Sequence, residues 1–365
     1  MLLRSYVFRA GRLPVDVALV CSLLPAGFLY RYLEPAGCGA RKERQIRSGL
    51  QMIMQKTPNC PWNATVIGEY LLRLGNGQGW QLTATKGVEP EVGELARIMG
   101  LATCESNGYP RLIFVRKVQE QAEWEDTLSR QNKNMEGDLR DLGWEAYDLR
   151  VLRVWHHSDT PDLLCEMNHE EGVYEQRILS MRLALYPIYQ QVVDSGGLPF
   201  HAGLVQHGDK GVLLAAPRNV GKSTSCRRLP CPWLSLCDEE TLIVRDDEKT
   251  YAVHPFPTWS EYFDKRSNKS WNVERHVPLA AIFFLEQAAA DEVIPLGQGE
   301  ATACINHLAL QVCYRYWADI DFAEMRSRRT TLLENICQLV RAVPAFRLRV
   351  SLHGRFWERI EKVLP

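Results

Sequence analysis

The sequence lacks an excess of charge of either sign, a long uninterrupted apolar run and a C-x-x-C pair. Its formal net charge of −1 gives no reason to expect nucleic acid or an anionic membrane as a partner. Hydrophobic residues make up 46% and charged residues 24%, as in ordinary globular proteins. The 365 residues suffice for one large domain or two ordinary ones with a core. We expect a globular protein without a stable membrane span.

The 11 cysteines are scattered and odd in number. Without a C-x-x-C pair they indicate neither a zinc site nor a disulfide framework. Three of them lie close together in the sequence: Cys226, Cys231 and Cys237. Another group of metal-ligating types has a spacing that matches no standard site: His156, His157, Cys165 and His169. We expect reduced thiols and a cytoplasmic location.

The first 65 residues are the least regular part of the chain. Pro14, Asp16 and Pro25 interrupt the apolar run over 13–30, so we do not expect a transmembrane helix. Arginines ahead of this run give a weak signal-segment pattern. We interpret residues 1–65 as an N-terminal extension, either disordered or the product of a start codon assigned too early.

Residues 66–174 are expected to form a smaller α+β region. Its predicted parts are a hairpin over 70–84, a short amphipathic helix with Val92, Leu95, Ala96 and Met99 on one face, and strands over 112–115, 147–155 and 163–167. The charge-rich stretch 117–143 is expected to be a surface helix or loop.

Residues 175–365 are predicted to form a second domain of the α/β class with a mixed sheet. A helix is predicted over 175–194, kinked at Pro187. Strands are predicted over 200–206, 211–215, 234–237, 242–245, 251–253, 280–285 and 346–352, and helices over 304–317, 330–343 and 355–363. The short polar connection 206–211 favours an antiparallel pair, so the domain is not a plain alternation of strands and helices.

The most informative segment follows the apolar strand over 212–215. Residues 216–223 fit G-x-x-x-x-G-K-[ST], except that Ala216 replaces the first glycine. Such a loop turns backbone N–H groups toward a phosphate at the start of a helix. We expect ATP to bind to the loop residues, which are Ala216, Pro217, Arg218, Asn219, Val220, Gly221, Lys222, Ser223 and Thr224.

Each fixed position of this pattern has a physical role. Gly221 permits close backbone approach, Lys222 reaches the β- and γ-phosphates, and the Ser223 hydroxyl binds Mg²⁺. We expect Thr224 to contact an α-phosphate oxygen, and Arg218 to face either the phosphates or solvent.

An acidic run follows the predicted loop helix (222–229) and a short strand. Asp238, Glu239 and Glu240 come at the carboxyl end of the strand over 234–237, where open α/β sheets bind their ligands. The alternative is a solvated acidic turn. The position of the acidic run, directly after the loop helix and the short strand, favours a metal-binding or catalytic role, because phosphoryl transfer requires such a carboxylate.

The order of His201, the loop and the acidic pair resembles the catalytic domain of the HPr kinase/phosphorylase family. In that family a histidine opens the strand before the loop, and two aspartates follow one helix later. A closer resemblance is to the HPr-kinase-like SynChlorMet cassette protein ScmC family of ribosomal-peptide gene clusters. It extends from about residue 65 to the C-terminus and rests on the segments 196–202, 237–240, 254–259 and 278–287.

The resemblance implies an ATP- and Mg²⁺-dependent serine/threonine kinase of the phosphoenolpyruvate-carboxykinase-like P-loop class. Its acceptor would be a small protein or a ribosomally made precursor peptide. Lys222 and Ser223 would hold phosphate and Mg²⁺, and Asp238 and Glu239 would act as the base and as a metal or water ligand. His201 would line the same pocket.

Two departures from the HPr kinase pattern matter. Glu239 stands where that family has its second aspartate, so either carboxylate can be the base. The glycine-rich signature used for phosphorolysis is absent from the sequence, so we expect no phosphorylase activity. Structural roles are the alternatives for His201, beside Phe200, and for His254, where the structural role is favoured.

Other nucleotide-dependent classes fit less well. The sequence has no Asn-Lys-x-Asp element of a GTPase and no Leu-Ser-Gly-Gly-Gln signature of a transporter ATPase. A small-molecule kinase stays open, as does a non-catalytic ATP-dependent switch or scaffold that presents a partner to other maturation enzymes. A switch would not need Asp238 as a base. The sequence gives no signal of the oligomeric state.

A surface for the acceptor is predicted within 251–271. This segment combines two cations, Arg266 and Lys269, with two aromatic residues, Trp259 and Trp271.

Overall fold

The computed structural model describes residues 66–104, 108–116, 139–217, 219–247, 249–264, 267–317 and 320–364. All of them belong to one compact unit, Pro58–Pro365. The expected extension 1–65, most of the charge-rich stretch 117–143, Arg218 and Arg266 lie outside the described residues. The predicted domain division between residues 174 and 175 stays a prediction.

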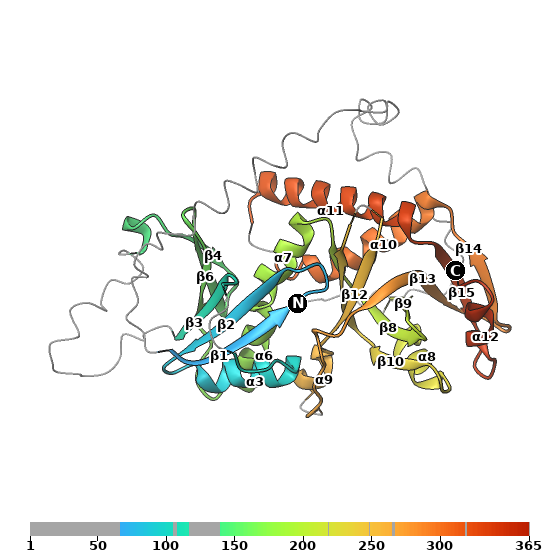
Figure 1. The fold of residues 1–365 in the computed structure, drawn as a ribbon, viewed down its shortest axis with the longest axis horizontal. Helices are drawn as coiled ribbons and strands as arrows, with labels where there is room; N and C mark the ends of the chain where they lie inside the picture. Colours follow the sequence, from blue (N-terminus) through green and yellow to red (C-terminus); the bar gives the residue numbers. More distant parts are fainter. Residues whose placement is uncertain are drawn as a thin grey trace, which may run out of the picture. The chain divides into compact units, whose positions relative to one another are not determined.

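The first sheet has six strands in the order β1-β2-β3-β6-β5-β4 (Figure 1). Their bounds are β1 (Val66–Arg73), β2 (Gly79–Thr85), β3 (Arg111–Arg116), β4 (Glu145–Asp148), β5 (Leu152–His157) and β6 (Thr160–Met167). β1 and β2 form the predicted antiparallel hairpin. Helix α3 (Glu89–Met99) packs on them and buries all four residues of the predicted apolar face. Both predictions are confirmed.

The single strand predicted over 147–155 is wrong. The chain forms two antiparallel strands, β4 and β5, joined by a tight turn. Arg150 adopts φ 68°, a left-handed conformation that is uncommon for a residue with a side chain. Asp148 stabilises it, because its Oδ1 accepts a hydrogen bond from the Arg150 N–H at 3.1 Å. The turn was hidden because apolar residues lie on both sides of it.

The single helix predicted over 175–194 is also wrong. The structure has two helices, α6 (Tyr174–Leu183) and α7 (Tyr186–Asp194). Pro187 lies in the first turn of α7, where its missing N–H breaks no intrahelical bond. Met181 on α6 and Ile188 on α7 are both buried, so the helical spacing of apolar residues continues across the break.

The second sheet is mixed and contains β7 (Leu198–Phe200), β8 (Ala202–His207), β9 (Lys210–Ala215), β10 (Leu234–Cys237), β11 (Glu240–Arg245), β12 (Tyr251–Phe256), β13 (Val277–Gln287), β14 (Glu292–Pro295) and β15 (Ala345–Val350). Its main order is β10-β8-β9-β13-β12-β11-β7, with β15 between β13 and β14. β13 runs parallel to β9 and β15, whereas β8 runs antiparallel to β9 and β10. The architecture is mixed α/β; its place in the P-loop class stays a prediction.

The strand predicted over 200–206 is two strands with His201 between them. β7 pairs with β11, and β8 pairs with β9 and β10. The chain therefore changes its neighbours at His201, which moves this residue from a strand interior to the point where β8 begins.

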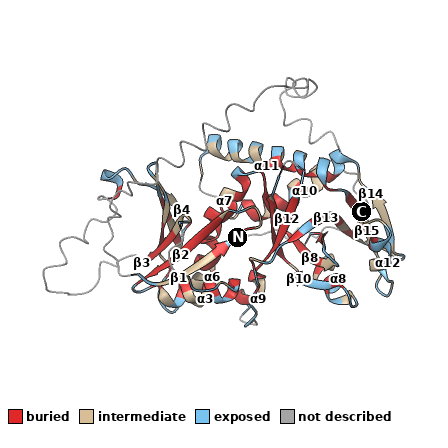
Figure 2. Ribbon diagram, in the orientation of Figure 1, coloured by how far each residue is buried: buried red, intermediate tan, exposed pale blue. Residues whose placement is uncertain are grey.

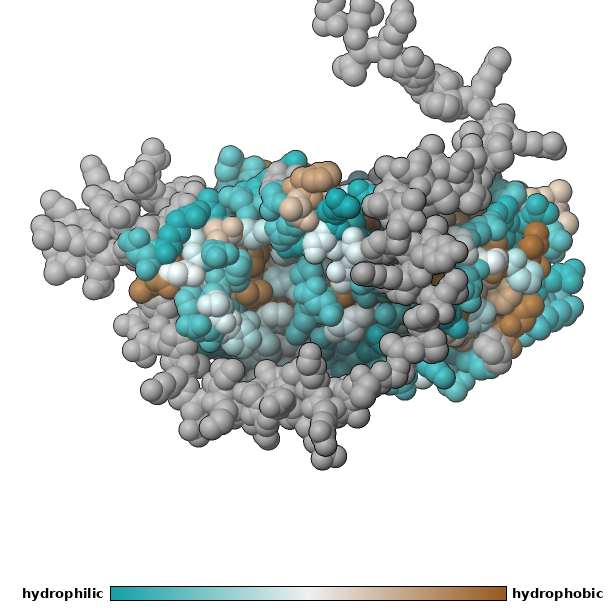
Figure 3. Space-filling view, turned by 90° about the horizontal axis from the view of Figure 1, so that it is seen from above, coloured by the Kyte–Doolittle hydropathy of each residue, from teal (hydrophilic) through white to brown (hydrophobic). Residues whose placement is uncertain are grey.

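Five helices complete the described residues after β9. They are α8 (Lys222–Arg228), α9 (Trp259–Phe263), α10 (Gln298–Cys313), α11 (Phe322–Ala342) and α12 (Phe356–Glu361). α10 and α11 pack on each other, and α12 contacts β14 and β15. Most strand residues are buried, whereas α11 keeps an exposed outer side (Figure 2). The described surface seen in Figure 3 is mainly hydrophilic, with hydrophobic residues in small separate groups.

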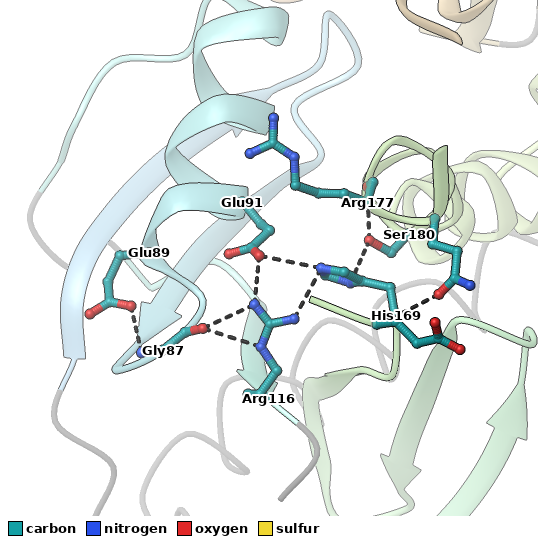
Figure 4. A network of polar contacts seen from close by, with 9 residues as sticks. Gly87, Glu89, Glu91, Arg116, His169, Arg177 and Ser180 are labelled. Carbon is teal, nitrogen blue, oxygen red and sulfur yellow. Dashed lines mark hydrogen bonds and ion pairs between the residues drawn. The ribbon is translucent and has the colours of Figure 1, made fainter. Parts of the chain in front are cut away.

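A buried polar network joins the first sheet to α3 and α6 (Figure 4). Arg116 donates to Glu91 Oε1 at 2.5 Å and lies 3.0 Å from His169 Nε2. His169 Nδ1 lies 3.2 Å from the Ser180 hydroxyl, which donates to a backbone carbonyl. Ser180, His169 and Glu91 follow the order of a nucleophile, a base and an orienting acid. Ser180 is fully buried, so the network joins elements and offers no reacting hydroxyl.

This network makes stability depend on acid pH through Glu91. Burial alone would raise the pKa of its carboxyl, but hydrogen bonds from His169 and Arg116 outweigh burial and lower it to about 2. Because the folded pKa lies below the ordinary 4.5, the stabilisation is present above pH 4.5 and is lost as pH falls toward 2. Between pH 4.5 and pH 2, we expect the free energy of unfolding of the native protein to fall by about 2 kcal/mol more than that of the Glu91→Gln variant, which has no carboxyl group to titrate at this position. Urea unfolding at both pH values checks this, and equal losses in the two proteins would contradict it.

Candidate functional site

Three segments that were predicted to act together lie at the same end of strands β8, β9 and β10 in the second sheet (Figure 1). β8 lies between β9 and β10 and is antiparallel to both, so β9 and β10 run in the same direction. The first residue of β8 pairs with the last residue of β9, and the last residue of β10 pairs two positions further along β8. The topology therefore brings together His201, the loop after Ala215 and the acidic turn that begins at Asp238.

The loop joins β9 to α8 through two residues in the left-handed region. Asn219 has φ 65° and Gly221 has φ 107°. A Cβ atom on Gly221 would meet no atom within 4 Å, so glycine is needed here for its backbone conformation and not for space. α8 then begins at Lys222, and the Ser225 N–H closes its first turn on the Gly221 carbonyl at 2.8 Å.

Lys222 points back into the loop. Its side chain is buried, and its Nζ donates to the Ala216 carbonyl at 2.6 Å. The same Nζ lies 2.9 Å from His201 Nε2. An ammonium group has donors only, so His201 Nε2 accepts this hydrogen bond and carries no proton in this arrangement. The structure thus brings the predicted histidine and lysine into direct contact.

The acidic turn is held by residues that the sequence did not single out. Asp238 is half-buried, and its Oδ1 accepts from the Thr258 hydroxyl at 2.8 Å. Glu239 is 8% exposed, and its Oε2 accepts from the Ser260 hydroxyl at 3.0 Å and from the Ser260 N–H at 3.2 Å. Thr258 and Ser260 lie at the start of α9. The sequence signal that could have identified them is the pair of hydroxyl residues on the two sides of Trp259.

Gly203 on β8 lets α8 and the acidic turn approach each other. A Cβ atom there would lie 2.7 Å from Cys226 Sγ on α8 and 3.4 Å from the Asp238 Cα. Burial raises the pKa of the Cys226 thiol to about 12; the negative charge of Asp238 adds to the rise and the positive charge of Lys222 opposes it. The Cys226 thiol therefore lies between the start of α8 and the acidic turn.

Glu240 follows the acid pair and is fully buried. Its carboxylate accepts hydrogen bonds from Tyr189 OH at 2.5 Å, Arg182 Nη2 at 3.0 Å and Arg315 Nη1 at 3.4 Å. Burial raises the pKa of Glu240, and the charge of Arg182 opposes this rise. Glu240 thus anchors the acidic turn to α6, α7 and the turn after α10 instead of facing solvent.

The predicted acceptor surface is wrong in its aromatic part. Trp259 is 0% and Trp271 4% exposed, so both belong to the core. Lys269 is exposed; it lies 3.7 Å from a Glu261 oxygen and 5.6 Å from the centre of the Trp271 ring. The tryptophans stand among charged residues in the sequence, which hid their burial.

His254 has a structural role, as the sequence favoured, and not a role in the site. Its Nδ1 lies 2.7 Å from the Val273 carbonyl, and its Nε2 accepts from the Gly75 N–H at 3.0 Å. Burial lowers its pKa to about 4, so it is neutral at pH 7. The residue therefore joins β12 to the β1–β2 turn.

Among the described residues no three His, Cys, Asp or Glu side chains form a group that could hold a metal ion. The described cysteines are all free thiols. None of the helices in the described ranges has both the length and the apolar character needed to cross a membrane.

Comparison with known proteins gives one family. The family model for the SynChlorMet cassette protein ScmC matches residues 163–365, which is more than half of the chain. The match is shorter than the resemblance stated from the sequence, which begins at about residue 65. It covers most of β6, all of the second sheet and the site described above. A search of the curated proteins finds no match. The chain belongs to the SynChlorMet cassette protein ScmC family.

Proposed function

We propose that this protein is an ATP- and Mg²⁺-dependent kinase that phosphorylates a serine or threonine of a small protein or a ribosomally made precursor peptide. The observation that carries the proposal is that the Lys222 loop follows β9 and Asp238 follows β10, so both leave the sheet at the same end, on the two sides of β8. A cation for phosphate and a carboxylate for the acceptor hydroxyl are the two groups that this reaction needs most. The proposal places the protein in the cytoplasm, where ATP is available.

The loop supports nucleotide binding. In the proposed complex Lys222 exchanges the neutral Ala216 carbonyl for phosphate oxygens, which are stronger acceptors because they are charged. His201 keeps Lys222 at the loop by accepting one of its three N–H donors. Ser223 and Thr224 lie in the first turn of α8, where backbone N–H groups have no intrahelical partner and favour an anion.

Mg²⁺ fits the donor set at this edge. Hard oxygen ligands, namely the Ser223 hydroxyl and the Glu239 carboxylate, are those that Mg²⁺ prefers, and phosphate and water oxygens complete such sites without a third protein ligand. When bound, the ion would neutralise negative charge that develops on the transferring phosphoryl group. Ser260 fixes the Glu239 carboxylate for this role through two hydrogen bonds to one oxygen.

Asp238 is the proposed base. Thr258 occupies Oδ1, and no other hydrogen bond of the described residues engages this side chain, so Oδ2 is available to the acceptor hydroxyl. The acceptor oxygen bonds to the γ-phosphorus, the bond from that phosphorus to the bridging oxygen breaks, and ADP leaves. The hydroxyl proton passes to Asp238.

Lys222→Ala tests the proposal. We expect transfer to fall at least about 100-fold, because a charged group that stabilises the transition state is lost. The assay incubates the protein with ATP, Mg²⁺ and each short peptide encoded beside its gene, and mass spectrometry detects the gain of one phosphoryl group. Lys249→Ala is the control, since Lys249 is an exposed lysine in the turn between β11 and β12. ATP binding with no phosphorylated peptide would favour the switch, and transfer to a metabolite would favour a small-molecule kinase.

A further inference from the structure

A groove opens at the carboxyl ends of the parallel strands β13 and β15. Its charged lining comes from Glu286, Asp291, Glu292, Arg349, Arg359 and Lys362. Between these groups, the groove is lined by an all-alanine segment, residues 288–290, which leaves room over the backbone.

The carboxylates of the groove already have partners. Glu292 pairs with Arg349 at 2.9 Å, and Glu286 pairs with Arg347 at 3.3 Å. Asp291 Oδ1 accepts from the Ser351 N–H at 2.6 Å. Arginines thus pair with Glu286 and Glu292, whereas Asp291 is hydrogen-bonded but keeps its negative charge.

The two cations at the C-terminal end of α12 are not compensated in this way. Arg359 and Lys362 are both exposed, and within the described ranges neither side chain makes a hydrogen bond or an ion pair. Arg359 lies in α12 and Lys362 caps its C-terminus with a helical backbone conformation, so the two residues, three apart, present their side chains on one face. The groove therefore presents two free positive charges side by side.

The groove is connected to the proposed phosphate loop. Gln287, between two groove residues, donates from Nε2 to the Val220 carbonyl of the loop at 3.3 Å. Arg228, the last residue of α8, donates to the Ser351 and Gly354 carbonyls at 2.9 and 2.6 Å, just after β15. The groove is thus linked to the loop at Val220 through Gln287, and to the C-terminal end of α8 through Arg228.

We propose that this groove binds an acidic segment of the acceptor peptide, so that Arg359 and Lys362 pair with carboxylates near the hydroxyl to be phosphorylated. The inference rests on the proposed function for the identity of the ligand. Two cations match one or two Asp or Glu side chains, and the neighbouring carboxylates disfavour a polyanion such as a nucleic acid.

The test measures peptide binding without ATP. The probe is a fluorescein-labelled peptide of alternating alanine and glutamate with one central serine, followed by fluorescence anisotropy at low salt. We expect the double variant Arg359→Glu/Lys362→Glu to raise the Kd at least about 10-fold, because attraction becomes repulsion at two positions. The same variant should bind the matching alanine and lysine peptide more tightly than the native protein does.

The control is Arg326→Glu/Arg329→Glu, which reverses two exposed arginines with the same spacing on α11. An equal loss in this control, unchanged binding in the groove variant, or no binding of the acidic peptide to the native protein overturns the proposal. Thermal unfolding of each variant is measured as well, because positive charges near the C-terminus of α12 stabilise the helix and their reversal can lower the stability of the protein.

Failure of this inference can be told apart from failure of the proposed function. If the groove variant weakens ATP binding and leaves peptide binding unchanged, the groove serves the nucleotide and the inference is wrong. If the groove variant binds the acidic peptide more weakly and the lysine peptide more tightly, but no peptide is ever phosphorylated, the peptide-binding role of the groove is supported and the kinase proposal fails.

Discussion

Asp238→Asn should lower the rate of phosphoryl transfer about 1000-fold and leave the Kd for ATP within about threefold. An amide has nearly the shape of the carboxylate and still accepts the hydrogen bond from Thr258, but it cannot take a proton from the acceptor hydroxyl. General-base catalysis contributes about 100- to 10,000-fold, which sets the expected loss. Single-turnover transfer and equilibrium ATP binding separate the two quantities. Asp246→Asn, an exposed aspartate just after β11, is the matched control.

Glu239→Gln decides between the two carboxylates. If Glu239 binds the metal, its amide variant should need more Mg²⁺ for half-maximal rate and recover at high Mg²⁺. A large loss in Glu239→Gln that Mg²⁺ does not restore, together with an active Asp238→Asn, would assign the base to Glu239. Transfer at native rate in both variants would remove the acidic pair from the mechanism.

The strand–loop–helix segment was predictable because its signals are local. The apolar run over 212–215, the Gly-Lys-Ser sequence and the short strand Leu234–Cys237 each have a residue pattern of their own, and the structure has these elements at nearly the predicted bounds. The groups that orient the acids were not predictable in this way. Thr258 lies 20 residues from Asp238, and Arg182 lies 58 residues from Glu240. Only tertiary packing brings such residues together.

Two of the wrong predictions, the single strand over 147–155 and the single helix over 175–194, have a common cause. Periodicity reports which face is buried, and it continues where the backbone turns without exposing that face. The apolar spacing therefore crossed the turn at Arg150 and the break before Pro187. Charged neighbours had the opposite effect on Trp259 and Trp271, which are buried although their sequence context is polar.

Glu240→Gln should destabilise the protein by about 3 kcal/mol, the largest loss that we expect from one substitution in the second sheet. Glu240 is fully buried, and the substitution leaves the buried Arg182 guanidinium without its carboxylate. The Arg315 side chain is 32% exposed and can be solvated by water instead, so losing its ion pair with Glu240 adds little to the destabilisation. Urea unfolding of the native protein and the variant gives the difference.

The double variant Glu240→Leu/Arg182→Met separates charge from packing. Removing both members of a buried pair leaves no unpaired charge, so it should recover much of the stability lost in Glu240→Gln. Tyr189→Phe, which deletes one hydrogen bond and keeps the ion pair, should cost only about 1 kcal/mol. If the double variant were no more stable than Glu240→Gln, packing and not the Arg182 charge would explain why Glu240 is needed. If it folds stably but transfers phosphate slowly, the ion pair also holds Asp238 and Glu239 in the geometry that the reaction requires.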